Sequence, residues 1–207
     1  MTDPITTSER LILRDFVEED LAHVYAIRSD PEVARFMDFA PETLEQTRGW
    51  LNGVITHSRE RKAPSDGYNL AVVLGATGRV IGWVGFGESE RFPPGSGEHG
   101  VGYMIARAHW RQGYASEALR AVIDFSFRSL GARRVSAWCW ADNAASARVM
   151  EKAGMRFVRR NERTEPKSGS STPCLEYAVR SDEWLRDEHD LHESARGGRS
   201  ETHSGSG

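Results

Sequence analysis

A short basic turn near the middle of the chain has the composition of an anion-binding site. The segment His109–Leu119 reads HWRQGYASEAL, and its single glycine, Gly113, stands just before an apolar helical pattern. The first N–H groups of a helix lack partners within the helix, and the helix dipole adds partial positive charge there. A phosphate would satisfy several of these donors, with Gly113 permitting close approach and Arg111 adding a cation. An ordinary strand-to-helix turn has the same residues, so the segment alone leaves both interpretations open.

A second helix start lies 30 residues beyond Gly113. Asn143 follows an expected strand and precedes a helix, and Ser146 stands three residues later. Asn143 suits a helix N-cap, but the two helix starts follow neighbouring strands of one expected crossover. The carboxyl ends of such strands share one crevice, so we expect Asn143 and Ser146 to face whatever Gly113 holds. The turn matches neither GxGxxG nor GxxxxGK[ST], which argues against dinucleotide and Walker-type nucleotide sites.

The elements that must position these residues follow from hydrophobic periodicity and turn chemistry. Strands are expected at Arg10–Asp15, Asn69–Leu74, Val80–Phe86, Val101–Ile105, Val135–Trp140, Met155–Arg160 and Leu175–Val179. Helices are expected from Glu18 to Ser29, from Pro41 to Lys62, from the glycine turn to Leu130 with Gly131 as C-cap, and from Ala144 to Ala153. This order predicts an α/β fold, a mixed sheet with helices on both faces, in which residues 100–140 form a right-handed parallel crossover.

The length of 207 residues favours a single domain, expected over residues 1–185. From 186 to 207 the apolar residues give way to Asp, Glu, Arg, Ser and Gly, which is typical of a mobile polar tail.

Composition narrows the classes of partner. A formal net charge of −3 argues against a nucleic-acid surface, and no apolar run is long enough to span a bilayer. The N-terminus lacks a signal-peptide pattern, so we expect a cytoplasmic protein without a membrane partner. The two cysteines form no disulfide framework and no zinc spacing, so no metal is expected, and Cys139 should be structural.

Three blocks of sequence extend the interpretation of the glycine turn and of the helix start at Asn143. They are ERLILR at Glu9–Arg14, GYMI at Gly102–Ile105 followed by WRQGYASEAL at Trp110–Leu119, and NAASARVMEKAGM at Asn143–Met155. In this order and spacing they resemble the GNAT superfamily of acetyl-coenzyme-A-dependent N-acetyltransferases, and most closely its RimJ/RimL branch. The resemblance covers about Glu9 to Trp184. It implies a mostly antiparallel central sheet with one splayed parallel pair, acetyl-coenzyme A as co-substrate, and acetylation of protein N-terminal amines.

The resemblance also implies which residues hold the coenzyme. Backbone amides from Gln112 to Ser116 would bind its pyrophosphate, and Tyr103–Ala106 would pair with its pantetheine arm like an added strand. A bulge near Met104 or Ile105 would turn one N–H toward the thioester carbonyl, and Asn143 would bind the pantetheine. The expected coenzyme residues are Tyr103, Met104, Ile105, Ala106, Arg111, Gln112, Gly113, Tyr114, Ala115, Ser116 and Asn143.

Two positions that carry catalytic residues in many relatives are altered here. Met150 stands where many superfamily members have a tyrosine acid, and Gly100 stands where relatives often have a glutamate base. Ser146 is the remaining hydroxyl on the same helix face, which makes it the candidate acid. Glu98 and His99 adjoin Gly100 and are the candidate bases.

The acceptor is less constrained than the donor. Deprotonating a lysine amine of pKa about 10.4 at pH 7 costs about 4.6 kcal/mol, whereas an α-amine costs only about 1–1.4 kcal/mol. An altered base position therefore favours a protein or peptide N-terminal α-amine. The alternatives are a small amine (an aminoglycoside, polyamine or amino acid), a non-catalytic acyl-coenzyme A module, and a site for another nucleotide. The oligomeric state stays open, a homodimer included.

Overall fold

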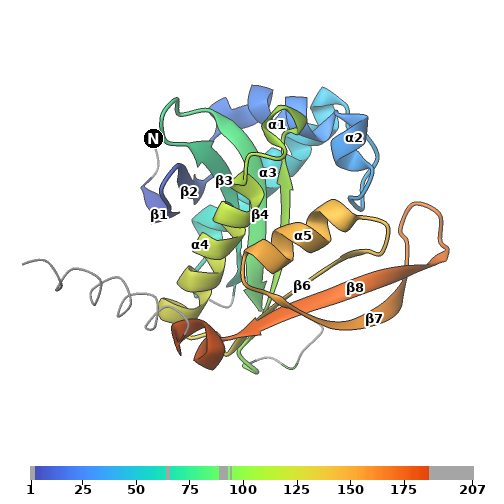
Figure 1. Ribbon diagram of the computed structural model, residues 1–207. Helices are drawn as coiled ribbons and strands as arrows, with labels where there is room; N and C mark the ends of the chain where they lie inside the picture. Colours follow the sequence, from blue (N-terminus) through green and yellow to red (C-terminus); the bar gives the residue numbers. More distant parts are fainter. Residues whose placement is uncertain (1–2, 64–65, 89–92, 94, 187–207) are drawn as a thin grey trace, which may run out of the picture.

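The computed structural model (Figure 1) describes residues 3–63, 66–88, 93 and 95–186. Its strands form one sheet in the order β1-β2-β3-β4-β5-β6-β8-β7. The strands are β1 Pro4–Thr7, β2 Leu11–Asp15, β3 Tyr68–Leu74, β4 Val80–Glu88, β5 Glu98–Ile105, β6 Arg134–Trp140, β7 Arg156–Thr164 and β8 Ser171–Arg180. The helices are α1 Leu21–Arg28, α2 Pro31–Ala34, α3 Leu44–Glu60, α4 Tyr114–Arg128 and α5 Ala144–Lys152, with 3-10 turns η1 Glu18–Asp20 and η3 Arg107–His109.

The predicted mixed sheet is confirmed. Neighbouring strands are antiparallel except β5 and β6, which are parallel and joined through α4. The β5–β6 pairing joins Glu98–Gly100 to Arg134–Ser136, although β5 continues to Ile105 and β6 to Trp140. The carboxyl-terminal halves of the two parallel strands therefore splay apart, and this opening lies beside the start of α4.

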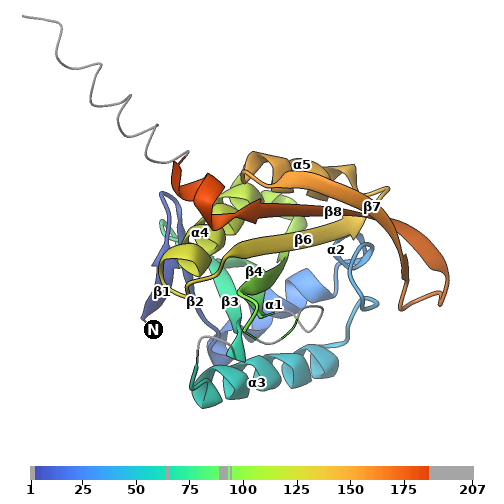
Figure 2. The same ribbon diagram turned by 90° about the horizontal axis from the view of Figure 1, so that it is seen from below.

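Helices cover both faces of the sheet, as Figure 2 shows, with α3 on one side and α4 and α5 on the other. Alternation along each strand explains the layering, because successive side chains point to opposite faces. In β5, Tyr103 packs with the α4 and α5 clusters, whereas Met104 packs with Ile27 of α1 and Val33 of α2. Residues adjacent in sequence thus lie on opposite faces of the sheet beside the opening.

Helix ends follow local capping chemistry. The α3 start has a capping box, in which Thr43 Oγ1 accepts from the Gln46 N–H at 3.2 Å and Gln46 Oε1 accepts from the Thr43 N–H at 2.8 Å. The expected C-cap at Gly131 is wrong: α4 ends at Arg128 with Ser129 as its C-cap, and Gly131 adopts a left-handed φ of 66° in the following turn.

Several boundaries differ from the sequence expectation. The strand β1 and the helix α2 were not expected, since each is only four residues long and too short to show a period. The hairpin strands β7 and β8 are longer than predicted, because their polar residues still pair from Arg156 with Ala178 to Thr164 with Ser171. The connection between the expected strands Val80–Phe86 and Val101–Ile105 is also shorter, since β4 and β5 pair as far as Glu88 and His99. Most of the predicted tail lies outside the described residues.

No helix among the described residues is both long and apolar enough to cross a membrane.

Candidate active site

The glycine turn leaves the start of α4 open to a ligand. Gly113 is the N-cap residue, with φ 84° and ψ −5°, and no side chain caps the helix there. Arg111, two residues earlier, also has a positive φ of 61°. Left-handed residues in such a turn direct neighbouring N–H groups into one concavity that suits an anion. The first amides of α4, from Tyr114, Ala115 and Ser116, complete this arrangement.

A salt bridge from the turn between β1 and β2 braces the glycine turn. Arg10 pairs with Glu117 of α4 at 2.6 Å, and its Nη1 donates to the Gln112 carbonyl at 3.1 Å. The Glu117 carboxylate also accepts from Ser8 Oγ at 2.7 Å. Burial of Glu117 acts against ionisation, but the hydrogen bonds from Ser8 and Arg10 prevail and lower its pKa. Glu117 is therefore ionised, and its charge is balanced by Arg10, which reduces the repulsion between Glu117 and an anion at the helix start.

Arg10 was not among the expected site residues. A Cβ on Gly113 would lie 3.3 Å from Arg10 Nη2, so the brace approaches the turn closely. The motif ERLILR contained the residue, but no local pattern indicates a partner 107 positions away.

The turn is also tied to the end of β5. The Trp110 indole N–H donates to the Ile105 carbonyl at 2.7 Å, and the Gln112 amide donates to the Ala108 carbonyl at 3.1 Å. Trp110 is 41% exposed, so it lies at the rim of the turn rather than beneath it. These hydrogen bonds fix the position of the turn relative to the carboxyl end of β5.

The β5 segment Tyr103–Ala106 borders the opening. Its residues pair one to one with β4, from Glu88 with His99 to Gly82 with Ile105, so the bulge expected near Met104 or Ile105 is wrong. The irregularity lies in β4 instead, where Ile81 has no partner in the register with β3. Alternate N–H and C=O groups of an antiparallel strand point away from its partner, so β5 offers hydrogen bonds to the opening without a bulge.

Four polar side chains meet on the α5 side of the opening. Asn143 Oδ1 accepts from the Ser146 N–H at 3.1 Å, which makes it the N-cap of α5. The Tyr103 hydroxyl lies 2.8 Å from Ser146 Oγ and 3.2 Å from the Ser146 carbonyl. The thiol of Cys139 is the fourth, and its pKa is raised to about 11 by burial, against a hydrogen bond from Ser146. Cys139 is 5% exposed and belongs to the core, as expected.

The candidate bases lie at the closed end of the opening. Glu98 pairs with Arg134 at 2.9 Å, where β5 and β6 are still joined. His99 is 3% exposed, its Nδ1 has no hydrogen-bond partner, and burial lowers its pKa despite the nearby charge of Glu88. Its strand neighbour across the parallel pair is Val135, so its side chain is on the α4 face. The two candidates therefore face opposite sides of the sheet.

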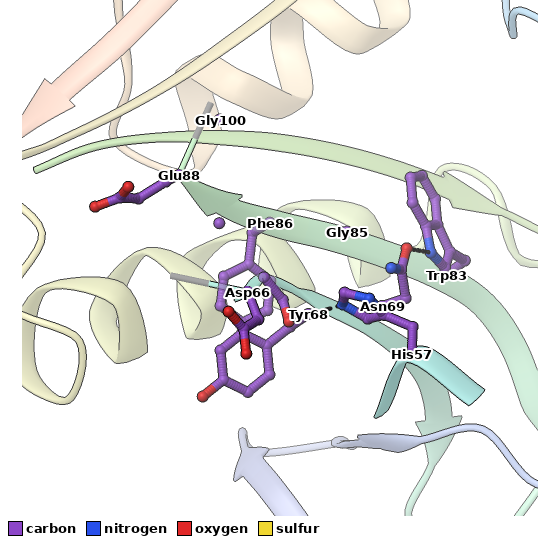
Figure 3. Close-up of a pocket in the computed structure, with 11 residues that line it drawn as sticks. His57, Asp66, Tyr68, Asn69, Trp83, Gly85, Phe86, Glu88 and Gly100 are labelled. Atoms are coloured by element: carbon purple, nitrogen blue, oxygen red, sulfur yellow. Dashed lines mark hydrogen bonds between the residues drawn. The ribbon is translucent and has the colours of Figure 1, made fainter. Parts of the chain in front are cut away.

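A cavity of about 320 Å³ lies on the other face of β4 and β5 (Figure 3). The side chains of Asn69 and Trp83 are joined there by a 3.0 Å hydrogen bond. A Cβ on Gly85 would overlap the Trp83 ring, so glycine at this position gives the indole room to lie across the strand. Asp66 adds negative charge, because backbone hydrogen bonds from Lys62 and Ala63 lower the pKa of its carboxyl. The cavity also takes in Gly100, the last β5 residue paired with β6.

The β6 side of the opening carries aromatic and basic groups. Trp138 is 38% exposed and lies 4.9 Å from Trp140, ring centre to ring centre, and the Arg163 guanidinium stacks over it at 4.3 Å. The β7–β8 hairpin then reaches across to α2. Lys167 Nζ donates to the carbonyls of Ala34 at 2.5 Å and of Arg35 at 3.3 Å.

No group of three or more His, Cys, Asp or Glu side chains that could hold a metal ion occurs in the part of the chain that the structure describes.

Comparison with known proteins agrees with this geometry. A model of the acetyltransferase (GNAT) domain matches residues 10–156. The N-acetyltransferase YoaA of Bacillus subtilis (strain 168) is 30% identical over 154 residues, which cover 74% of this chain and 83% of YoaA. The N-acetyltransferase p20 of Bacillus licheniformis is 32% identical over 144 residues, which cover 69% of this chain and 77% of p20.

Solved structures share the fold. A GNAT-family acetyltransferase from Bacillus anthracis superposes with a TM-score of 0.75 at 27% identity, covering 86% of this chain and 98% of its own. A Vibrio cholerae protein described as a ribosomal-protein-serine acetyltransferase gives 0.71 at 20%, covering 87% and 99%. The aminoglycoside acetyltransferase AAC(6')-Ib, in complex with coenzyme A, gives 0.66 at 18%, covering 85% and 98%. The last two show the fold alone.

The chain therefore belongs to the GNAT family and is an N-acetyltransferase. Acetyl-coenzyme A is the co-substrate that this fold uses.

Proposed function

We propose that the protein transfers the acetyl group of acetyl-coenzyme A to the N-terminal α-amine of a protein or peptide. The observation that carries the proposal is the opening between β5 and β6 beside an uncapped helix start. One end of the opening suits a pyrophosphate, and its walls suit an extended amide-bearing arm.

The coenzyme would bind mainly through backbone groups. The amides of Gln112–Ser116 would hold the pyrophosphate, and Arg111 would contribute a cation at the rim. The Tyr103–Ala106 strand edge would pair with the two amides of the pantetheine arm. Asn143 keeps its side-chain N–H groups available, because its Oδ1 is the atom that caps α5.

The reaction is a direct attack on the thioester. The amine nitrogen forms a bond to the acetyl carbon, the carbonyl becomes an oxyanion, and the carbon–sulfur bond then breaks with its electron pair passing to sulfur. The nitrogen loses one proton, and the thiolate gains one. The β5 N–H of Ile105, which points away from β4 and toward the opening, would stabilise the oxyanion.

Ser146 is the candidate donor to the leaving sulfur. A serine-to-alanine change there should lower kcat about 10- to 100-fold while leaving coenzyme A affinity unchanged, since a hydrogen bond to a charged group contributes about 1.5–3 kcal/mol. Unchanged kcat would exclude this role.

The base is Glu98 or His99 in this proposal. Burial lowers the pKa of His99, so its imidazole is neutral at pH 7 but is a weaker base than an exposed histidine, whereas Glu98 would first have to leave its pair with Arg134. The matched variants Glu98→Gln and His99→Gln distinguish them through the acidic limb of the kcat/KM pH profile.

The acceptor would approach from the face that carries the Asn69–Trp83 cavity. The bridge from Lys167 to the carbonyls of Ala34 and Arg35 joins the β7–β8 hairpin to the end of α2. An α-amine at the end of a flexible chain suits such access, and its low pKa reduces the demand on the base.

A small cationic amine is the second candidate, and Asp66 favours it. Its ionised carboxylate lies in the cavity, where it would attract a polyamine or an aminoglycoside. Among the structural neighbours, AAC(6')-Ib is described as an aminoglycoside acetyltransferase. Asp66→Asn should lower kcat/KM for a polyamine severalfold and leave kcat/KM for a neutral peptide unchanged.

The decisive experiment follows the consumption of acetyl-coenzyme A over a panel of free N-terminal peptides, matched peptides with only an ε-amine, polyamines, amino acids and aminoglycosides. We expect the highest kcat/KM with free N-terminal peptides. Preference for the ε-amine or for a small amine would refute the α-amine proposal. Coenzyme binding without turnover across the whole panel would identify a non-catalytic acyl-coenzyme A module.

A further inference from the structure

A tyrosine from β5 reaches the helix that carries the candidate acid. The Tyr103 hydroxyl lies 2.8 Å from Ser146 Oγ, although the two residues are 43 positions apart and belong to different sides of the opening. Tyr103 is the residue of β5 just before Met104, and Ser146 lies in the first turn of α5, above β6. The contact therefore spans the gap where β5 and β6 separate.

The α5 position at which many relatives carry a tyrosine cannot supply a hydroxyl here. Met150 is fully buried and packs in the same cluster as Leu119 and Ile123 of α4. A phenol is nevertheless present at this helix, because Tyr103 brings one from the opposite strand. The chain thus places a phenol and a serine hydroxyl next to each other at the opening.

The chemistry of the phenol decides what it does. Burial raises the pKa of Tyr103, while its hydrogen bond with Ser146 acts in the opposite direction. A phenol of raised pKa keeps its proton at neutral pH and therefore donates rather than transfers it. If Tyr103 donates to Ser146 Oγ, the serine keeps its own hydrogen for an acceptor, which is the sulfur of Cys139 in this structure and would be the sulfur of coenzyme A when that is bound.

The surroundings of Ser146 hold this geometry. Its backbone N–H is bound by Asn143 Oδ1 at 3.1 Å, which fixes the helix start. The ionisable groups that act on this cluster are the thiols of Cys139 and Cys174 and the carboxylate of Asp142. Burial raises the pKa of Cys139 to about 11, so this thiol is neutral under ordinary conditions.

We propose that Tyr103 orients the Ser146 hydroxyl toward the sulfur of coenzyme A and so stabilises the leaving thiolate. Tyr103 is a positioning residue in this role, and the proposal rests on the acetyl transfer proposed above. The phenol keeps its proton throughout, and no bond to it forms or breaks.

The thiol pKa of bound coenzyme A tests this without knowledge of the acceptor. The thiolate has its own ultraviolet absorbance, so a pH titration of the coenzyme A complex reports the pKa directly. In the unaltered protein we expect it below the ordinary thiol value of about 8.5. Tyr103→Phe should reduce the thiolate-to-thiol ratio at fixed pH by roughly fivefold, the equivalent of one hydrogen bond. Coenzyme A affinity should be unchanged at a pH well below the thiol pKa, where the bound thiol is protonated.

Tyr177→Phe is the matched control. Tyr177 belongs to the same core cluster, and its hydroxyl also bonds to α5, but at Glu151, 3.2 Å away. This variant should titrate like the unaltered protein. Ser146→Ala should shift the thiol pKa at least as far as Tyr103→Phe, and the double variant should go no further than Ser146→Ala, since the two residues act through one hydrogen bond.

The possible failures can be told apart. If calorimetry detects no coenzyme A binding, the proposed function fails, and this inference fails with it. If coenzyme A binds and the thiol titrates identically with Tyr103 and with Phe at position 103, only the positioning role fails. Equal shifts in Tyr103→Phe and Tyr177→Phe would also overturn it, because a general loosening of α5 would then be the cause.

Discussion

Two helices begin at the same edge of the sheet, and they begin in opposite ways. The start of α5 is capped by its own side chain, with Asn143 Oδ1 on the Ser146 N–H. The start of α4 has Gly113 as its N-cap residue and no side-chain hydrogen bond. The chain caps one helix start with a side chain and leaves the other without a side-chain cap.

The difference separates the tasks of the two helices. An uncapped helix start is a local cost in stability unless something else fills it, since its N–H groups need partners. A capped start is rigid, which suits a helix that must hold the Ser146 hydroxyl in place. We therefore assign anion binding to α4 and positioning of the reacting groups to α5.

The largest effect is expected when α4 is given a capping side chain, because its start would then resemble that of α5. Gly113→Asp places an acceptor where the pyrophosphate would bind, and aspartate tolerates positive φ better than most residues. Coenzyme A affinity should fall by about 100-fold, from charge repulsion and from the filled cradle. Calorimetry measures it, with the neutral Gly113→Asn as control and a smaller loss expected there. Unchanged affinity in the aspartate variant would contradict an anion site at α4.

Removing the brace should weaken the same site less. Arg10→Gln loses the pair with Glu117 and the bond to the Gln112 carbonyl, so the turn is held less firmly and Glu117 is no longer neutralised. We expect coenzyme A affinity to fall about fivefold. Adding Glu117→Gln should restore part of the affinity, and a further loss in that double variant would argue against the electrostatic explanation.

Removing Asn143 should cost stability through the lost cap of α5, and coenzyme A affinity through the lost amide. Asn143→Ala removes the N-cap and should lower the free energy of unfolding by about 1 kcal/mol, measured by urea denaturation. Asn143→Ser keeps a cap and should recover most of that loss. A coenzyme A affinity that falls with the cap intact, in the serine variant, would show that the asparagine amide itself contacts the coenzyme.

Removing the bridge from the β7–β8 hairpin to α2 should change the KM of the acceptor but not that of acetyl-coenzyme A. Lys167→Met removes the donor to the Ala34 carbonyl and keeps the length of the side chain. We expect the KM of the best acceptor in the panel to change about threefold, with the KM of acetyl-coenzyme A unchanged. An equal change in both constants would show that the hairpin also supports the α4 and α5 side.

The smallest effect should come from His99. Burial lowers its pKa, so the unfolded chain takes up a proton near pH 6.5 that the folded chain refuses, and stability falls as the pH falls below that value. His99→Gln should flatten the decline of the melting temperature between pH 6.5 and 5 by a few degrees at most. The same change at the more exposed His109 should do less, and an equal response at both positions would exclude burial as the cause.

Much of the fold was predictable because its long elements carry clear periods. The hairpin of β3 and β4, the β5–α4–β6 crossover and α5 all formed where apolar spacing predicted them. The four-residue elements β1 and α2 were not predicted, because they are too short to show a period. The polar ends of β7 and β8 were not predicted either, because their pairing depends on a partner strand and not on their own pattern.

By itself the sequence determined the local parts of the site. A glycine before a helix, an asparagine at the next helix start and a serine three residues later are short-range features, and short-range sterics and hydrogen bonds are written in neighbouring residues. Only the tertiary structure decided which distant side chains meet. The contacts of Arg10 with Glu117, of Tyr103 with Ser146 and of Lys167 with α2 join residues 43 to 133 positions apart. Such pairings depend on how strands are ordered and where β5 and β6 separate, and no local propensity specifies that.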